Sequence, residues 1–184
     1  MQLAMPMNFK NMLKLLIDFF EEEHLDYALI GAFALKAYGY ARATQDIDIV
    51  ARRKDQNKIV AKLETIGFET IYRSSGYSNH VHPIFKAGRI DFVYVGGRTA
   101  DTLFGAVREL LVLGDIRVPV VSPEHLVALK LFAIKNNPQR LLRDLADIKY
   151  LVDLPGISKP EVKRAFEKYG LMDKYHELLK KEKE

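Results

Sequence analysis

The chain has 184 residues and a formal net charge of +4, and it contains no cysteine. Its chemistry therefore has to come from carboxylates, histidines and basic side chains, which excludes a disulfide framework and a thiolate metal site. No apolar run is long enough to span a bilayer, and the N-terminal segment lacks a basic start and a small-residue cleavage site. We expect a cytoplasmic protein of one domain, or one domain with a helical appendage, without membrane partners.

The first part of the chain is expected to alternate amphipathic helices with short strands. Apolar residues recur at three- and four-residue spacing in the helical segments, and the strands are short apolar runs. Asn8 and Asp55 are the expected N-caps. Gly31, Gly39 and Gly67 are expected to end the elements before them. The expected elements are a helix over residues 8–23, a strand over 26–30, a helix over 32–38, a strand over 46–50 and a helix over 55–66.

Further strands and then a series of helices are expected in the rest of the chain. Strands are expected over 81–85 and 89–95, joined by a turn at Ala87 and Gly88, and over 116–121. Pro119 lies inside the last of these and suggests an edge strand. Ser122 followed by Pro123 is a strong helix start. The expected helices cover residues 99–110, 122–135, 139–152, 160–168 and 172–181.

This order of elements predicts an α+β fold, in which a mixed β-sheet is flanked by helices and followed by a helical C-terminal part. We place an α/β core at residues 1–121 and a C-terminal helical region, packed on that core, at residues 122–184.

Two aspartates, Asp46 and Asp48, stand inside the apolar strand expected over 46–50. Strands are poor in aspartate, because a short charged side chain packs badly on a half-buried pleated surface. Residues two apart in a strand project from the same face, so the two carboxylates can converge on one point. A hard divalent cation such as Mg²⁺ would remove the repulsion between them.

Asp91 is a third carboxylate in an apolar strand, within Arg-Ile-Asp-Phe-Val-Tyr-Val. Three aspartates on two strands could face one another and form the carboxylate set of a two-metal phosphoryl-transfer site that uses Mg²⁺ or Mn²⁺. The alternative interpretation is that they pair with nearby arginines on an exposed face; the candidates are Arg42, Arg52 and Arg89.

Gly31 and Ala32 stand at a strand-to-helix junction one short helix before the aspartates. A missing Cβ at Gly31 lets backbone approach a phosphate, and amides at a helix start can bind the anion. Arg42 and Thr44, in the loop that follows, could neutralise and hydrogen-bond a phosphate oxygen. Phosphates at the helix start and metals at the next strand would then belong to one bound nucleotide.

A further charged group occupies the helices expected over 122–135 and 139–152. Lys130 interrupts the apolar face of its helix, and a lysine point charge suits phosphate contact. Arg143, Asp144 and Asp147 share one helix with Arg140 at three- and four-residue spacing, so some of them are expected to be intrahelical ion pairs. Separately, His80 and His82 share one face of an expected strand. A transition-metal site there lacks a third ligand nearby and is disfavoured against a solvent-facing pair or a base-contacting role at the rim of the cleft.

These motifs together resemble the nucleotidyltransferase superfamily that includes DNA polymerase beta, and specifically its small prokaryotic branch of minimal nucleotidyltransferases and AbiEii-type toxins. The sequence Ile30-Gly31-Ala32, a spacer and Asp46-Ile47-Asp48 match the family pattern of a hydrophobic residue, Gly, Gly or Ser, and then Asp-x-Asp/Glu. Arg42-Ala43-Thr44 looks like the Arg-x-Ser/Thr lead-in of the family. Asp91 corresponds to the third family carboxylate, and the segment from Ser122 to Ile148 looks like the AbiEii-type downstream region.

The resemblance implies a Mg²⁺- or Mn²⁺-dependent enzyme that transfers a nucleoside monophosphate from an NTP to a hydroxyl acceptor. Asp46, Asp48 and Asp91 would hold the metals, and the Gly31-Ala32 amides and Lys130 would contact the phosphates. Asp144 or Asp147 would support the site. The acceptor would be RNA such as a tRNA 3′ end, a protein or a small molecule, and the protein would be one component of a toxin–antitoxin pair.

Ala32 departs from the Gly or Ser of the family and offers no hydroxyl to a triphosphate. It therefore favours an alternative, a weakly active or inactive nucleotidyltransferase-like protein that binds a partner, for example as an antitoxin. A third hypothesis is an RNA-binding protein without nucleotide chemistry, whose RNA affinity would be sensitive to salt and indifferent to Asp46 and Asp48.

Overall fold

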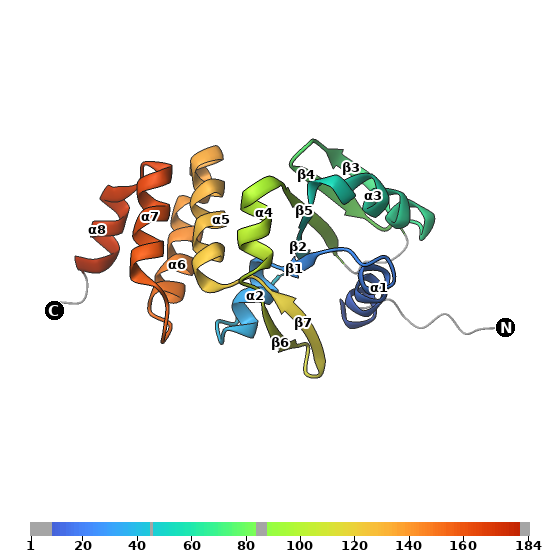
Figure 1. The fold of residues 1–184 in the computed structure, drawn as a ribbon, viewed down its shortest axis with the longest axis horizontal. Coiled ribbons are helices and arrows are strands. Elements are labelled where there is room, and N and C mark those ends of the chain that lie inside the picture. Colours follow the sequence, from blue (N-terminus) through green and yellow to red (C-terminus); the bar gives the residue numbers. More distant parts are fainter. Residues whose placement is uncertain (1–8, 45, 84–87, 181–184) are drawn as a thin grey trace. The chain divides into compact units, whose positions relative to one another are not determined.

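The computed structural model describes residues 9–44, 46–83 and 88–180, and the chain divides into two compact units, residues 1–121 and 122–184. The first unit contains a β-sheet with helices, and the described part of the second consists of helices and their connections (Figure 1). The α+β class predicted from the sequence is therefore confirmed. Over the described residues, no helix combines the length and apolar character needed to cross a bilayer.

The first unit follows the predicted order of helices and strands through its first half. Its helices are α1 (Phe9–Glu22), α2 (Gly31–Ala37), α3 (Gln56–Thr65), which follows the 3-10 turn η1 (Arg53–Asp55), and α4 (Gly97–Phe104). Its strands are β1 (Tyr27–Leu29), β2 (Asp46–Arg52), β3 (Glu69–Arg73), β4 (Tyr77–Val81), β5 (Arg89–Val95), β6 (Arg108–Val112) and β7 (Ile116–Val120). The expected N-cap Asn8 lies outside the described residues, and Asp55 makes no side-chain capping bond.

The strands form one mixed sheet in the order β3-β4-β5-β2-β1-β7-β6. The neighbours β2 and β5 are parallel over seven paired residues, from Asp46 opposite Arg89 to Arg52 opposite Val95. On its other side, β2 pairs antiparallel with β1. Strands β2 and β5 therefore lie in the interior of the sheet, where both neighbours fix the position of their side chains.

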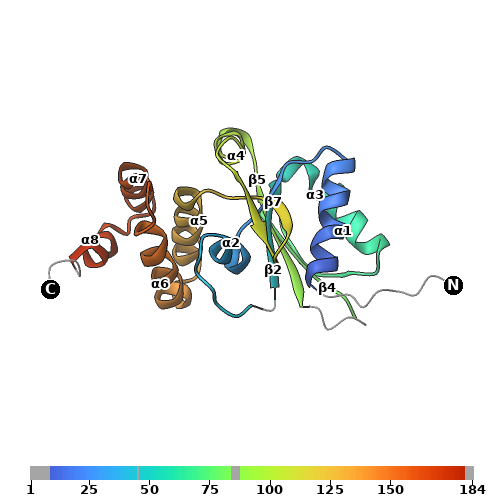
Figure 2. The same ribbon diagram turned by 90° about the horizontal axis from the view of Figure 1, so that it is seen from below.

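The two faces of the sheet carry different helices. Figure 2 shows α1 and α3 on one face and α2 on the other. On the first face Phe20 of α1 stacks on Tyr27 with a centroid separation of 4.4 Å and meets the edge of Phe92 at 6.2 Å. Burying an apolar side chain of this size contributes about 1.5–3 kcal/mol. The alternate β2 residues Ile47 and Ile49 are buried, whereas Asp46 and Asp48 are half-buried. Because strand side chains alternate, the aspartates share the other face.

In the middle of the chain, the strand expected over 89–95 is confirmed as β5, one other strand prediction was wrong, and one strand was not predicted. The strand expected over 81–85 is instead β4, which ends at Val81, and residues 84–87, including the expected turn residue Ala87, lie outside the described residues. Strand β3 was not predicted. The buried residues of β4 are Ser78 and His80, and β3 is mostly exposed, so neither strand has the alternation of apolar and polar residues that predicts a half-buried strand.

The helix expected over 99–110 was also wrong in its second half, because α4 ends at Phe104 and residues 108–112 form β6. Strand β7 is not at the edge of the sheet, since β6 lies outside it. Its pairing with β1 is nevertheless limited to Val120 opposite Leu29. Pro119 is therefore tolerated in a strand that is hydrogen-bonded mainly on one side.

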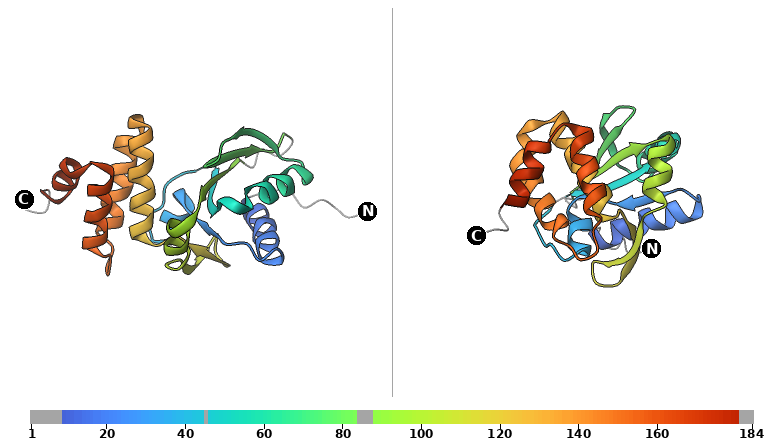
Figure 3. Two further views of the ribbon diagram at one scale, coloured as in Figure 1. Left: turned by 45° about the horizontal axis from the view of Figure 1, so that its top comes forward. Right: turned by 60° about the vertical axis from the view of Figure 1, so that its left-hand side comes forward.

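The second unit contains α5 (Pro123–Asn136), the 3-10 turn η2 (Pro138–Arg140), α6 (Leu141–Val152), α7 (Lys159–Tyr169) and α8 (Met172–Lys180). The side chain of Ser122 accepts a hydrogen bond from the backbone N–H of His125, which confirms the predicted helix start. Helix α7 ends at Gly170, which has a φ of 70°. Helix α5 packs on both α6 and α7, and α7 packs on α8 (Figure 3).

Candidate functional site

Asp46, Asp48 and Asp91, hereafter the three site aspartates, lie on one face of the first unit's sheet. Asp48 and Asp91 are direct register partners on the parallel strands β2 and β5, and Asp46 is two residues before Asp48. Residues in register on neighbouring strands, and residues two apart on one strand, project from the same face. All three are half-buried. The structure therefore brings together the three carboxylates that the sequence singled out.

Gly31 contacts the carboxylate of Asp48. It is the first residue of α2 and has a φ of 64°, in the left-handed region that favours glycine. A Cβ built at this position would lie 2.6 Å from Cγ and 2.8 Å from Cβ of Asp48, well inside van der Waals contact. The backbone N–H of Ile30 also donates to the carbonyl of Asp48 at 3.0 Å. The strand-to-helix junction is thus fixed directly against the second aspartate of the pair.

Two further side chains contact the site aspartates. Nε of Arg89 lies 2.7 Å from Oδ1 of Asp91, and its Nη2 lies 3.3 Å from Oδ2 of Asp46. The amide nitrogen of Asn79, on β4, donates to Oδ1 of Asp91 at 2.6 Å. Arg89 was considered in the sequence as a partner of the aspartates, and this pairing is present. Arg52, considered with it, binds Asp26 and Asp101 instead.

The environment of Asp91 has opposing effects on its ionisation. Burial raises the pKa of the Asp91 carboxyl above its ordinary value, against the smaller lowering effects of Asn79 and Arg89. Burial also acts to lower the pKa of Arg89, but the charges of Asp91 and Asp46 outweigh it and raise that pKa. A partly desolvated carboxylate that is paired with a cation is a group that a metal ion could bind.

The donor chemistry of the three site aspartates fits a hard cation, because Mg²⁺ and Mn²⁺ are bound by carboxylate oxygens. Among the residues that the structure describes, no three acidic or histidine side chains are gathered closely enough to hold a metal ion. The guanidinium of Arg89 instead forms ion pairs with Asp46 and Asp91. The residues fit the metal in kind, and their negative charge is partly balanced by this arginine.

The remaining predicted nucleotide contacts of the first unit lie close to these aspartates in sequence. Ala32 is buried in α2, and Arg42 is half-buried in the connection between α2 and β2. The hydroxyl of Thr44 accepts from the backbone N–H of Asp46 at 3.2 Å and donates to its carbonyl at 3.1 Å. Thr44 thus fixes the start of β2, and its predicted contact with a phosphate stays a prediction, as does that of Arg42.

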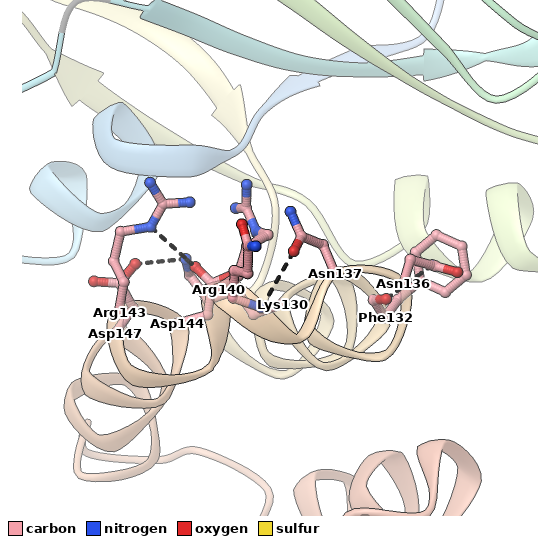
Figure 4. Close-up of polar contacts among 9 residues, drawn as sticks. Lys130, Phe132, Asn136, Asn137, Arg140, Arg143, Asp144 and Asp147 are labelled. Atoms are coloured by element: carbon pink, nitrogen blue, oxygen red, sulfur yellow. Dashed lines mark hydrogen bonds and ion pairs between the residues drawn. The ribbon is translucent and has the colours of Figure 1, made fainter.

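A second group of charged residues lies in the second unit, between α5 and α6 (Figure 4). Nζ of Lys130 lies 2.6 Å from Oδ2 of Asp147 and 3.2 Å from Oδ1 of Asp144. The other carboxylate oxygen of Asp144 accepts from Nε of Arg140 at 2.8 Å, and Arg143 lies within 3.8 Å of the same carboxylate. The side chains of Lys130, Asp144 and Asp147 are 9%, 0% and 2% exposed.

This buried network ties α5 to α6. Removing water from ionised groups costs several kcal/mol per ion, so buried charges persist only when they are paired and hydrogen-bonded. The ammonium of Lys130 meets this requirement through its two aspartates. The predicted contact between Lys130 and a phosphate, and the supporting role of Asp144 and Asp147, stay predictions.

The histidine pair was placed wrongly by sequence reasoning. His80 is fully buried, and its ring nitrogens lie 2.7 Å from the Ser78 hydroxyl and 3.2 Å from the Thr70 hydroxyl. His82 packs against the edge of Phe68. Burial lowers the pKa of His80 to about 4. His80 is therefore a neutral core residue within a polar network.

Asn79 is a site residue that sequence reasoning missed. It is the register partner of Asp91 on β4, and recognition of that strand would have placed its amide next to the third carboxylate. The available signal was the polar run Tyr77-Ser78-Asn79-His80 between the bend at Gly76 and Val81, which carries no apolar periodicity.

The same fold occurs in solved nucleotidyltransferases. An antigenic nucleotidyltransferase-like protein from Paracoccidioides brasiliensis is 18% identical, with a TM-score of 0.60 over 93% of this chain and 90% of that one. ANT(2″)-Ia in complex with adenylyl-2″-tobramycin is 14% identical, with a TM-score of 0.56 over 92% and 94% of the chains. The lincosamide antibiotic adenylyltransferase LnuA, lincomycin-bound, is 19% identical, with a TM-score of 0.50 over 79% and 98%. At these identities the likeness establishes the fold alone.

The sequence itself matches the family model described as the nucleotidyl transferase AbiEii toxin of type IV toxin–antitoxin systems, over residues 13–182. This span covers nearly the whole chain, and the chain belongs to the AbiEii nucleotidyltransferase family. No curated protein sequence matches it significantly. The resemblance drawn from the glycine, the aspartate pair and the third aspartate is thereby confirmed, and the protein is a nucleotidyltransferase.

Proposed function

We propose that the protein uses Mg²⁺ or Mn²⁺ to transfer a nucleoside monophosphate from an NTP to a hydroxyl acceptor, and that the three site aspartates form the reaction centre. The observation that carries this proposal is the register of β2 and β5, which sets Asp48 opposite Asp91 while Gly31 lies against the Asp48 carboxylate. Three carboxylates on one face of two neighbouring strands are unusual, because strands are poor in aspartate and nearby carboxylates repel one another; Arg89 pairs with only Asp46 and Asp91 among them.

In the proposed reaction the acceptor hydroxyl attacks the α-phosphorus, the bond to the bridging oxygen breaks, and pyrophosphate leaves. Asp46, Asp48 and Asp91 would hold the metal, which would neutralise charge on the phosphates and activate the hydroxyl when bound. Asp91 would also accept the hydroxyl proton, because burial raises the pKa of its carboxyl and so makes it a better base. Positioning and charge neutralisation account for most of the catalysis of such transfers, so no covalent nucleophile is required.

The phosphates would be bound by the backbone amides of Gly31 and Ala32, by Arg42 and Thr44, and by Lys130. Asp144 and Asp147 would then orient Lys130, since both hydrogen-bond its ammonium. An alanine at position 32 removes a side-chain hydroxyl and leaves its backbone N–H as a donor. This arrangement implies weaker phosphate binding than a serine would give, without excluding binding.

The acceptor is proposed by chemical class. The solved ANT(2″)-Ia complex contains adenylyl-2″-tobramycin, and LnuA is a lincosamide adenylyltransferase, so hydroxylated small molecules are one class. RNA, including a tRNA 3′ end, and protein hydroxyl groups are the others. The family description names a toxin of a type IV system, and we propose that the protein acts with an antitoxin partner in the cytoplasm.

The first test is a thermal-unfolding series with each NTP and Mg²⁺ or Mn²⁺. A ligand that binds only the folded protein stabilises it by about 2.7 kcal/mol at a hundredfold excess over its dissociation constant. We expect a metal-dependent NTP shift in the wild type that is lost in the double variant Asp46→Asn with Asp48→Asn. The matched control is Asp26→Asn with Asp101→Asn, which removes two aspartates bound to Arg52 in the same unit.

A shift that persists in the site variant would place the nucleotide elsewhere, and a folded protein that responds to no nucleotide would contradict the proposed function. A second candidate function is then favoured, a partner-binding protein with a weak or inactive site. Two observations support this second function: the alanine at position 32, and the ion pairs that Arg89 forms with two of the three carboxylates. Turnover of a labelled NTP with any acceptor would exclude it.

A further inference from the structure

Arg89 binds two of the three site aspartates at once. Its guanidinium is planar with five N–H donors, so it can satisfy two carboxylates that a single ammonium could not bridge in the same way. Nε lies 2.7 Å from Asp91 and Nη2 lies 3.3 Å from Asp46. Arg89 is also the register partner of Asp46 across β2 and β5, which brings its side chain to the same face as the aspartates.

The side chains of Asp91 and Arg89 differ in their exposure to solvent. The side chain of Asp91 is 15% exposed, whereas that of Arg89 is 42% exposed. The carboxylate is held in place by the sheet and by Asn79, but the arginine has solvent on one side. A long side chain of this kind can leave its partners and keep its charge hydrated, so release from the carboxylates does not bury an unpaired cation.

A divalent cation at these carboxylates would use the same oxygens. A metal ion and a guanidinium repel each other, and the lone pairs of Asp46 and Asp91 that accept from Arg89 would be directed to the metal instead. Binding of the metal therefore includes the loss of at least one arginine contact, and the affinity for the metal is lowered by the free energy of that contact.

We propose that Arg89 is an internal counter-ion of the site: it occupies Asp46 and Asp91 in the metal-free protein and is displaced from at least one of them by the divalent cation. The inference rests on the proposed metal-dependent function and adds a regulatory property to it. In the metal-free protein, Arg89 reduces the electrostatic repulsion between the carboxylates of Asp46 and Asp91. It thereby sets the metal concentration at which the site is filled. Arg89 is in this sense a positioning residue.

Arg52 provides a matched control on the neighbouring strand. It also bridges two carboxylates, Asp26 and Asp101, with its Nη1 2.7 Å from Asp101. Its side chain is 23% exposed, and neither of its partners is a proposed metal ligand. Replacement of Arg52 by glutamine therefore removes the same kind of double ion pair from the same sheet without altering the site aspartates.

The experiment is a Mn²⁺ titration of the full chain, stripped of metal and without nucleotide, in which electron paramagnetic resonance measures free Mn²⁺. We expect Arg89→Gln to bind Mn²⁺ about tenfold more tightly than the wild type, which corresponds to about 1.4 kcal/mol. Arg52→Gln should bind as the wild type does. Arg89→Lys, which keeps the charge but lacks the planar set of five N–H donors, should lie between them. Addition of Asp48→Asn to either background should weaken binding and so locate the ion.

The outcomes separate this inference from the function on which it rests. Wild-type binding that is unchanged or weakened in Arg89→Gln would overturn the counter-ion role and leave the metal site standing. An absence of Mn²⁺ binding in both the wild type and Arg89→Gln would instead contradict the proposed metal-dependent function together with the inference.

A measurement on the wild type does not depend on the folding of any variant. In a ¹⁵N spectrum of arginine side chains, the Nε–H of Arg89 should be protected from solvent exchange without metal, because it donates to Asp91. The Nη2–H of Arg89, which donates to Asp46, should be protected likewise. Saturating Mg²⁺ should remove the protection of at least one of these two groups, while the Nε–H of Arg52 should not change. Retained protection of both groups at saturating Mg²⁺ would overturn the inference.

Discussion

Gly31 contacts Asp48 at the junction between β1 and α2. Because of this contact, the backbone conformation of Gly31 and the position of the Asp48 carboxylate depend on one another. The φ of 64° at Gly31 turns the backbone from the strand into α2, and the absence of a Cβ leaves the space that the Asp48 side chain occupies. From the sequence alone, this space was expected to admit a phosphate. The structure shows that a protein side chain already uses it, so the glycine has a structural role in addition to any role toward a ligand.

Replacement of Gly31 by alanine should therefore be costly for two reasons. A left-handed conformation costs a non-glycine residue about 1–2 kcal/mol, and overpacking against Asp48 should add about 1–3 kcal/mol. Gly97 is a matched control, because it also begins a helix, has a φ of 55° and would place a Cβ in open space. Urea unfolding should show a larger loss for Gly31→Ala than for Gly97→Ala, and equal losses would contradict the contact.

His80 gives the protein a predictable dependence on pH. Burial lowers its pKa from the ordinary 6.5 to about 4. Between these values the unfolded chain binds the proton and the folded protein does not, so stability is fully present above about pH 6.5 and is lost as the pH falls toward 4. The slope from one such group is at most about 1.4 kcal/mol per pH unit.

Urea unfolding of the wild type and of His80→Gln at a series of pH values between 7 and 4 measures this slope. We expect the variant to be less stable at pH 7, where it loses the hydrogen bonds to Ser78 and Thr70, and to lose less further stability on acidification. The pKa of His125 is also lowered by burial, so part of the wild-type slope should remain in His80→Gln. Identical pH dependences of the two proteins would show that His80 is not buried in the neutral form.

At the scale of elements, the parts of the fold that follow apolar periodicity could be predicted, and the parts held by polar side chains could not. The amphipathic pattern predicted α1 and α3 to within one residue at every end, and the Ser122-Pro123 motif predicted the start of α5. Strands β3 and β4 were not predicted because the buried side of β4 is formed by Ser78 and His80. These two side chains hydrogen-bond to one another, and Ser78 also hydrogen-bonds to the hydroxyl of Tyr94. No local pattern of hydrophobicity reports a strand whose core side is polar.

The site residues likewise divide into those that a local sequence pattern could predict and those that it could not. The alternation of side chains in a strand placed Asp46 and Asp48 on one face, and the apolar surroundings of Asp91 marked it as a third carboxylate. Their meeting depends on the parallel pairing of β2 with β5, which is a long-range property of the sheet. Asn79 could not be found, because its position beside Asp91 follows from a strand that was itself not predicted.

The buried network between α5 and α6 makes a prediction at this scale. Lys130→Met leaves Asp144 and Asp147 buried with one cation fewer, and breaking a buried ion pair in this way costs about 3–5 kcal/mol. Lys149 is the control, since it pairs with Asp153 on the exposed side of α6 and its side chain is 32% exposed. Lys149→Met should cost below about 1 kcal/mol.

Urea unfolding and amide hydrogen exchange in α5 and α6 measure both variants. We expect Lys130→Met to lose protection throughout the two helices and Lys149→Met to keep it. Similar stability of the two variants would contradict a network that holds the helices together.

At the scale of the whole molecule, the candidate residues are divided between the two units. The three site aspartates, Gly31 and Arg89 belong to residues 1–121, and Lys130 with its two aspartates belongs to residues 122–184. The family match runs from residue 13 to residue 182 and so includes both units. The proposed reaction centre therefore lies wholly within the first unit, and Lys130, whose phosphate contact stays a prediction, belongs to the second.

The most direct test of the central claim follows the two ends of the triphosphate separately. The full chain is incubated with Mg²⁺ and with NTPs labelled at the α- or the γ-phosphate, and with RNA, protein and hydroxylated antibiotics as acceptors. We expect label from the α-phosphate to be transferred to an acceptor, label from the γ-phosphate to appear in pyrophosphate, and both to be lost in Asp46→Asn with Asp48→Asn. Transfer of the γ-label to the acceptor, or α-label transfer that survives in the double variant, would contradict nucleotidyl transfer at these aspartates.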